Sequence, residues 1–186
     1  MATEGGVLTK STEIRVSGYG GQGVVLAGML LGKAAALYDG KEAVFTQSYG
    51  PEARGGASCA DIVVSDGPID YPLVSSPDIL VTLFQEAYVK YRPTLRDGGL
   101  LILESSLVHP SKEVHPYSAI DATAMADGLG KRLVMNVIVL GFLVGKTGVV
   151  SVESMQKAIE STMKSKTVEL NLRAFEAGLE RATKAA

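Results

Sequence analysis

The sequence predicts an α/β fold, with a Rossmann-like, mostly parallel sheet covered by helices and with a helical C-terminal region. Strand-like and helix-like runs alternate up to residue 121, which is typical of parallel sheets with helices on their faces. A glycine turn separates the first strand from the first helix. Beyond residue 122 the apolar residues recur at helical spacing. With 186 residues, 46% of them hydrophobic, the chain suffices for one domain with a sizeable core.

The first half of the chain predicts strands and helices in the order β-α-β-β-β-α-β-β. A flexible arm is expected over residues 1–12, and the single domain over 13–186. The helix expected over 24–37 is apolar on nearly every side, so one side can lie on the sheet while another needs a second layer or a partner subunit. The other expected elements are strands over 13–18, 41–48, 59–66, 78–84 and 98–105, a helix over 85–95, and a short Pro-interrupted strand within 114–121.

The spacing of apolar residues predicts that the C-terminal region, after residue 122, consists only of helices. Ser151 stands where a helix N-cap is expected, ahead of apolar residues at helical spacing: Val152, Met155, Ile159 and Met163. The last segment carries an apolar stripe of Val168, Leu172, Phe175, Leu179 and Ala182. Its other face holds Asn171, Ala174 and Gly178, which are small enough for another element to pack closely. Gly141 and Gly145 have the spacing of a close helix contact.

Composition excludes several classes of function. A net charge of −2 and a pI near 5.7 give no basic field for nucleic acid. The apolar stretch 133–145 is too short to span a bilayer, and no signal peptide opens the chain, so a cytoplasmic protein without membrane contact is expected. Cys59 is the only cysteine, which excludes an internal disulfide and an iron–sulfur cluster held by this chain alone. Only His109 and His115 could supply imidazole, so no metal site is expected.

The glycine turn has the G-x-G-x-x-G spacing of a dinucleotide-binding fold at Gly18, Gly20 and Gly23. Such a turn allows close backbone approach, and the following helix offers N–H groups to an anion. The NAD fingerprint also requires an acid at the end of the second strand, where this chain has Thr-Gln-Ser. Asp39 lies at roughly the right distance in the sequence, but Asp39-Gly40 is better interpreted as the turn before that strand. Three interpretations therefore stay open: NAD binding, glycines that serve packing, or a contact with another phosphate or a partner.

Gln22 lies inside this turn, and the dinucleotide fingerprint does not require it. Its amide could cap the turn or reach a ligand. The sequence favours neither.

A second unusual stretch, Gln47–Ser58, combines an aromatic residue, a proline, an acid, a base and three glycines. Arg54 brings a planar guanidinium that suits a carboxylate or a phosphate. The segment either is a surface loop tethered by Glu52 and Arg54, or faces a substrate, a coenzyme phosphate or a partner chain. It is expected beside the glycine turn, at the strand ends where open α/β sheets bind ligands.

The other candidate residues are weaker. Cys59 is best interpreted as a small buried hydrophobe. Asn136, alone in an apolar helix, predicts an internal hydrogen bond or a partner contact. No Ser/His/Asp or Cys/His constellation and no pair of poised carboxylates stands out, so catalytic machinery is expected to be absent from this chain.

Three stretches together resemble one family: "GYGGQGVVLAGMLLGKAA", "QSYGPEARGGASCADIVVSD", and the pair "VMNVIVLGFL" and "LNLRAFEAG". They resemble the gamma subunit or gamma domain of 2-oxoacid:ferredoxin oxidoreductases, most closely the 2-oxoglutarate type. The resemblance runs from about residue 14 to residue 178. Related branches that act on pyruvate or branched-chain 2-oxoacids share these motifs.

The resemblance implies a non-catalytic subunit of an enzyme that decarboxylates a 2-oxoacid, transfers the acyl group to coenzyme A and reduces ferredoxin. It implies that thiamine diphosphate, Mg²⁺ and the iron–sulfur clusters lie in partner subunits, and that coenzyme A is a co-substrate of the complex. The implied partners are alpha and beta subunits, a delta subunit where the complex has one, and ferredoxin through the complex. The isolated chain could also form a homodimer through its apolar helix surface. The alternative function is a stand-alone NAD(P)- or nucleotide-binding protein.

Carried over by position, the resemblance assigns two motifs to a surface that faces the coenzyme or a partner. The first motif is Gly18, Gly20, Gly21, Gln22 and Gly23. The second motif is Gln47, Ser48, Tyr49, Gly50, Pro51, Glu52, Arg54, Gly55 and Gly56. We refer to them below as the glycine turn and the second motif.

Overall fold

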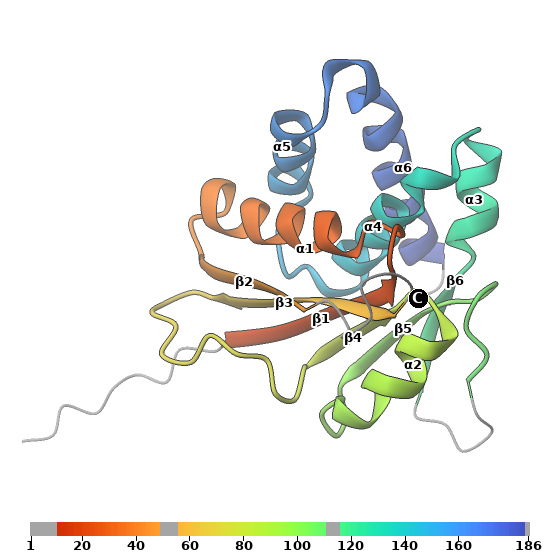
Figure 1. Cartoon of the computed structure of the whole chain (residues 1–186). Coiled ribbons are helices and arrows are strands. Elements are labelled where there is room, and N and C mark those ends of the chain that lie inside the picture. The colour runs from red at the N-terminus through yellow and green to blue at the C-terminus, as the bar shows by residue number, and fades with distance from the viewer. Residues whose placement is uncertain (1–10, 49–55, 111–115, 185–186) are drawn as a thin grey trace, which may run out of the picture.

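The computed structural model describes residues 11–48, 56–110 and 116–184, which build one six-stranded sheet with helices on both faces (Figure 1). The strands lie in the order β2-β3-β1-β4-β5-β6. Their bounds are β1 Ser11–Tyr19, β2 Glu42–Ser48, β3 Ala57–Ser65, β4 Ile79–Thr82, β5 Leu100–Glu104 and β6 Tyr117–Ile120. Ser11 and Thr12, placed in the arm by the sequence, pair with β3, and residues 1–10 lie outside the described part of the chain.

The sheet is mostly parallel, as the sequence predicts, and β3 is the one reversed strand among the six. β1, β4, β5 and β6 pair in parallel, while β3 is antiparallel to both β1 and β2. β2 therefore runs in the same direction as β1. The connection from β2 to β3 is too short for a crossover helix, so the two strands can pair only in opposite directions.

Helices cover the two faces of the sheet unequally. α1, α3, α4, α5 and α6 lie over one face and α2 lies over the other, as Figure 1 shows. Their bounds are α1 Val24–Lys33, α2 Gln85–Tyr91, α3 Ala122–Gly128, α4 Met135–Thr147, α5 Val152–Thr162 and α6 Ser165–Lys184. α1 continues as a π-helical turn over Ala34–Tyr38, and short 3-10 turns follow α2 (Arg92–Thr94) and precede α4 (Arg132–Val134).

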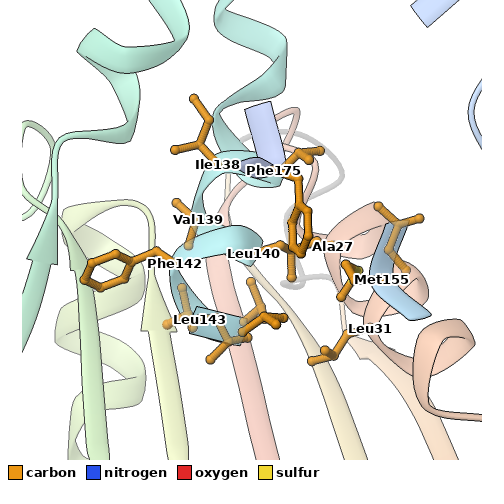
Figure 2. Close-up of a cluster of buried hydrophobic side chains, with 14 of the residues drawn as sticks. Ala27, Leu31, Ile138, Val139, Leu140, Phe142, Leu143, Met155 and Phe175 are labelled. Atoms are coloured by element: carbon orange, nitrogen blue, oxygen red, sulfur yellow. The ribbon is translucent and has the colours of Figure 1, made fainter. Parts of the chain in front are cut away.

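The main core fills the space between the sheet and the larger helical layer. Side chains from α1, α4, α5 and α6 pack together there. Leu31, Leu140, Met155 and Phe175 belong to one cluster of buried hydrophobic residues (Figure 2). α4 is the central helix of this layer, because every residue from Met135 to Val144 is buried. Such a helix needs apolar side chains on every side, which the run "MNVIVLGFLV" supplies.

α4 and α6 cross in direct backbone contact. A Cβ on Gly141 would overlap the carbonyl oxygen of Phe175, and a Cβ on Gly178 would overlap that of Ile138. The small residues that the sequence placed on one face of α6 are buried in this crossing. The prediction of close packing on that face is confirmed.

The face under α2 is held by a polar clamp as well as by apolar contacts. The buried Arg15 guanidinium donates two hydrogen bonds of 2.7 Å to Asp61, one to the Val74 carbonyl and one to Thr94. Burial alone would lower the pKa of Arg15, but the hydrogen bond and charge of Asp61 outweigh it and raise that pKa. The clamp joins β1 to β3, to the segment after β3 and to the 3-10 turn after α2.

Two local expectations are confirmed. Ser151 caps α5, because its Oγ accepts a hydrogen bond from the Ser154 N–H at 3.1 Å. Asp39 ends the helical run before β2, and its carboxylate accepts hydrogen bonds from Ser151. Among the described residues, no helix combines the length and the apolar character needed to cross a membrane.

Candidate functional site

The glycine turn lies at the sheet edge where the parallel strands end. It begins at Gly18 within β1, whose last residue is Tyr19, and leads into α1. β4, β5 and β6 end at the same edge, because they are parallel to β1. Ligands of open α/β sheets bind at this edge. The location alone makes the turn the first candidate for a functional surface.

Gln22 braces the turn from within. Its Oε1 accepts a hydrogen bond from the Tyr19 N–H at 2.6 Å, and its Nε2 donates to the Leu83 carbonyl at 3.0 Å. A Cβ on Gly18 would lie 2.6 Å from the Gln22 Oε1, so this glycine leaves the room that the brace needs. Of the two roles that the sequence left open, the structure shows the cap: both ends of the amide are used inside the chain.

Asn136 holds the turn from the other side. It lies in the first turn of α4 with 2% of its surface exposed, and its Nδ2 donates to the Gly23 carbonyl at 3.1 Å. Gly23 adopts a φ of 75°, and a Cβ there would overlap the Asn136 amide. The expected internal hydrogen bond of Asn136 is therefore present, and it joins residues 113 positions apart in the sequence.

Between these two braces the backbone of the turn is open. Gly20 and Gly21 are exposed, and a Cβ on either would meet no atom within 4 Å. Gly21 needs glycine for its φ of 96°, whereas Gly20 has no positive φ and no crowding. Nothing in the described structure requires glycine at position 20. A close approach by a molecule outside the chain would require it.

Three hollows surround the turn, and Gly21 lines all three. The α1 hollow, of about 440 Å³, runs along the exposed side of α1, and among the described residues no charged one lines it; it includes Tyr19, Gly20, Val25, Met29 and Ser58. The α3 hollow, of about 270 Å³, includes Gln22, Leu107, Thr123, Arg132 and Met135. The α6 hollow, also of about 270 Å³, includes Leu26, Lys131, Asn136, Met163 and Asn171. Leu133, 72% exposed, lies between the last two and lines both.

The second motif begins and ends beside the turn. Ser48 pairs with Cys59 across β2 and β3, and Gly18 pairs with Ser58 across β1 and β3. Ser58 also lines the α1 hollow, and its Oγ donates to the Gly18 carbonyl at 3.4 Å. Gln47, Ser48 and Gly56 are described, and the first two are exposed at the edge strand β2. Tyr49, Gly50, Pro51, Glu52, Arg54 and Gly55 lie outside the described residues.

Among the described residues, the end of β2 offers no acid of the kind found in a nicotinamide site. Asp39 is bound elsewhere: its two carboxylate oxygens accept hydrogen bonds of 2.7 Å from the Ser151 N–H and from the Ser151 hydroxyl. β2 ends in Thr46, Gln47 and Ser48. A ribose would therefore find no carboxylate at its usual place.

Sequence reasoning missed the residues that other segments bring to the turn. Lys131, Arg132 and Leu133 lie just before α4 and line the α3 and α6 hollows. An exposed basic pair followed by leucine, immediately ahead of a wholly buried helix, was the available signal. Glu104 was also missed; it is fully buried at the end of β5, and its Oε1 accepts a hydrogen bond of 3.0 Å from the N–H of Thr123, a residue that lines the α3 hollow. An acid closing an apolar strand could have marked it.

Two observations limit the chemistry of the described side chains. Cys59 is buried at 3% exposure, and burial raises the pKa of its thiol, which keeps it protonated and unreactive. Within residues 11–48, 56–110 and 116–184, no three His, Cys, Asp or Glu residues lie close enough to hold a metal ion. What the site offers is open backbone, apolar hollows and two basic side chains. These features are typical of a surface that binds another molecule.

The comparisons with known proteins identify the family. A model of the family described as "Pyruvate ferredoxin/flavodoxin oxidoreductase" matches residues 13–181. The 2-oxoglutarate synthase subunit KorC of Methanocaldococcus jannaschii is 49% identical over 172 residues, which cover 90% of this chain and 92% of that protein. The chain belongs to this family. It is a gamma-type subunit of a 2-oxoacid:ferredoxin oxidoreductase, and a free-standing nucleotide-binding protein is not favoured.

Solved structures show the same fold. The gamma subunit of a keto/oxoacid ferredoxin oxidoreductase from Geobacter sulfurreducens PCA superposes with a TM-score of 0.86 at 43% identity, covering 95% of this chain and 98% of that one. The 2-oxoglutarate:ferredoxin oxidoreductase of Magnetococcus marinus, solved with 2-oxoglutarate, coenzyme A and succinyl-CoA bound, has a TM-score of 0.86 at 21% identity. This chain covers 32% of that longer one. At that identity the likeness concerns the fold.

Proposed function

We propose that this chain is the cofactor-free gamma subunit of a complex that oxidatively decarboxylates 2-oxoglutarate, forms succinyl-CoA and reduces ferredoxin. Its partners are an alpha and a beta subunit, with a delta subunit where the complex has one, and these hold thiamine diphosphate, Mg²⁺ and the iron–sulfur clusters. The complex works in the cytoplasm. This chain contributes a shaped surface, at which the glycine turn and the second motif face coenzyme A or a partner subunit.

The observation that carries the proposal is the contrast within the glycine turn. Gly18 and Gly23 make room for contacts inside the chain, whereas a Cβ added at the exposed Gly20 or Gly21 would meet no atom of the described residues within 4 Å. Hollows surround this exposed backbone, and Lys131 and Arg132 line two of them. Such a surface suits a partner subunit or a phosphate-bearing ligand. The single, buried cysteine agrees with clusters held by other subunits.

Arg54 is the residue of the second motif with the largest expected effect. A guanidinium can bind a phosphate or a carboxylate in a bidentate fashion, and its loss removes charge-assisted hydrogen bonds. In the reconstituted complex, Arg54→Ala should raise the apparent KM for coenzyme A about tenfold or weaken subunit assembly to a similar degree. Steady-state assays of coenzyme-dependent dye reduction and size-exclusion chromatography measure the two outcomes.

The matched control is Arg181→Ala, at the exposed end of α6 and away from the turn. It should change neither quantity. If Arg54→Ala also leaves the KM and the assembly unchanged, the second motif does not face the coenzyme or a partner.

A further inference from the structure

The two edge strands of the sheet differ in how far they are protected from pairing with another chain. β6 has four residues and follows directly after Pro116, and a short strand beside a proline offers little backbone to a further strand. β2 has seven residues, pairs with β3 without a bulge, and contains no proline and no lysine. Its one charged residue, Glu42, is the first of the seven. Among the described residues no strand pairs with the outer side of β2, so this edge is open.

The side of α1 next to this edge is apolar. Cβ atoms on Gly28 and Gly32 would meet Phe45 of β2, so these glycines mark the side of α1 that lies on β2. Met29, the next residue after Gly28, is 39% exposed, and Val25 lies one helical turn before it. The buried residues of α1 face the core, where they meet α4 and α5. An exposed apolar helix side beside an open strand edge is typical of a surface that an assembly buries.

The sequence of β2 is complementary to itself. Two copies related by a two-fold axis perpendicular to the sheet are antiparallel, and a single register, with Phe45 at the axis, pairs all seven residues. Glu42 then lies opposite Ser48 of the second copy, and Val44 lies opposite Thr46, so no charge meets a like charge. The two Phe45 side chains form a cross-strand aromatic pair on the face that the α1 helices cover (Figure 1).

We propose that β2 is an interface between two copies of this chain, which pair antiparallel about a two-fold axis so that one sheet runs through both copies. The pairing satisfies the backbone of the open edge and brings the apolar side of α1 into the same contact. A second copy is favoured over a strand of another subunit because β2 matches itself in charge and in side-chain character. The association needs neither a coenzyme nor another kind of subunit, so its test is independent of the proposed function.

Charge substitutions at Ser48 test the register. Ser48 is exposed, so the fold tolerates them. Sedimentation equilibrium of the purified full chain should show a dimer at micromolar concentration. Ser48→Glu places a carboxylate opposite Glu42 on both sides of the axis and should weaken the dimer about tenfold, whereas Ser48→Lys should strengthen it about threefold. Combining Ser48→Glu with Glu42→Lys should restore the wild-type association.

The matched control is Ser105→Glu, an exposed serine in the turn after β5, in the other half of the sheet. It should leave the dimer unchanged. A wild-type chain that stays monomeric up to about 100 µM overturns the proposal. So does a dimer whose affinity is the same with glutamate and with lysine at position 48, because the copies then meet through another surface.

Hydrogen exchange identifies what pairs with β2. In the purified chain, the outward-facing amides of residues 42–48 should exchange more slowly as the protein concentration rises, and this protection should be reduced in Ser48→Glu. Amides that become protected only after other subunits are added, in a chain that is monomeric by itself, would show that β2 pairs with a strand of a partner subunit. That result would overturn the pairing of two copies.

Discussion

The crossing of α4 and α6 and the glycine turn are both rich in glycine, but they use it in opposite ways. In the crossing, Gly141 and Gly178 each face the backbone of the opposite helix, and a Cβ on either would overlap a carbonyl oxygen. In the turn, Gly18 and Gly23 make room for the amides of Gln22 and Asn136, while Gly20 and Gly21 face open space.

The comparison distinguishes glycines that packing within the chain requires from a glycine that is available for contact with another molecule. The crossing is buried in the main core, so its glycines are explained completely by packing. The turn is explained only in part. Gly18 and Gly23 make room for the bracing amides and Gly21 needs its positive φ, but within the described residues neither crowding nor backbone conformation accounts for Gly20. A subunit that contributes a surface and no reactive group should show this pattern at the place where it meets its partner.

The largest effect is expected at the crossing. Gly178→Ala places a methyl group against the Ile138 carbonyl, so the two helices must separate, and the free energy of unfolding should fall by about 3 kcal/mol or more. Chemical denaturation of the isolated chain measures it. Gly128→Ala, at the end of α3 where a Cβ meets nothing, is the matched control and should be neutral or stabilising by about 0.5 kcal/mol. Equal effects of the two substitutions would contradict the packing account.

An intermediate effect is expected at the brace of the turn. Gln22→Ala removes the hydrogen bonds to the Tyr19 N–H and the Leu83 carbonyl, so the stability should fall by about 1–3 kcal/mol. The turn amides should also exchange faster with deuterium. Gln156→Ala, a half-buried glutamine in α5, is the comparison. A Gln22→Ala chain with wild-type exchange at residues 18–23 would show that the brace is not needed.

Much of the fold could be predicted from the sequence, because its signals are local. The alternation of strands and helices, the cap at Ser151 and the small face of α6 each depend on residues a few positions apart. The reversal of β3 was not predicted, because pairing direction depends on which strands become neighbours in space. The bracing role of Asn136 was not predicted for the same reason: its partner Gly23 lies 113 positions away.

The candidate site was predicted unevenly. The glycine turn is recognisable from the G-x-G-x-x-G spacing of its glycines. The second motif resembles that of the gamma subunits, and this resemblance indicated the right family. The contribution of Lys131, Arg132 and Leu133 was missed, because a basic pair ahead of an apolar helix is a weak signal until the folded chain places this segment beside the turn. The facing of the second motif stays a prediction.

The smallest effect concerns pH. Burial would raise the pKa of Asp39, but hydrogen bonds from Ser154 and Ser151 outweigh it and lower that pKa. A carboxyl whose folded pKa is depressed contributes stability above its unfolded pKa of about 3.9 and loses it as the pH falls through the folded value. The link between α5 and the end of the π-helical turn should therefore weaken below about pH 4. Unfolding free energies measured from pH 5 to pH 2 should depend less on pH in Asp39→Asn than in the wild type, and identical slopes would contradict this role.

The most direct test of the account is the substitution of Gly20 by alanine, measured twice. In the isolated chain, Gly20→Ala should leave the melting temperature unchanged, because a Cβ there meets no atom and the backbone has no positive φ. In the reconstituted complex, the same methyl group should weaken subunit assembly or coenzyme binding about tenfold, because a molecule that approaches the turn closely would meet it. A variant that assembles and binds coenzyme like the wild type would contradict the claim that the open backbone of the turn is this subunit's contact surface.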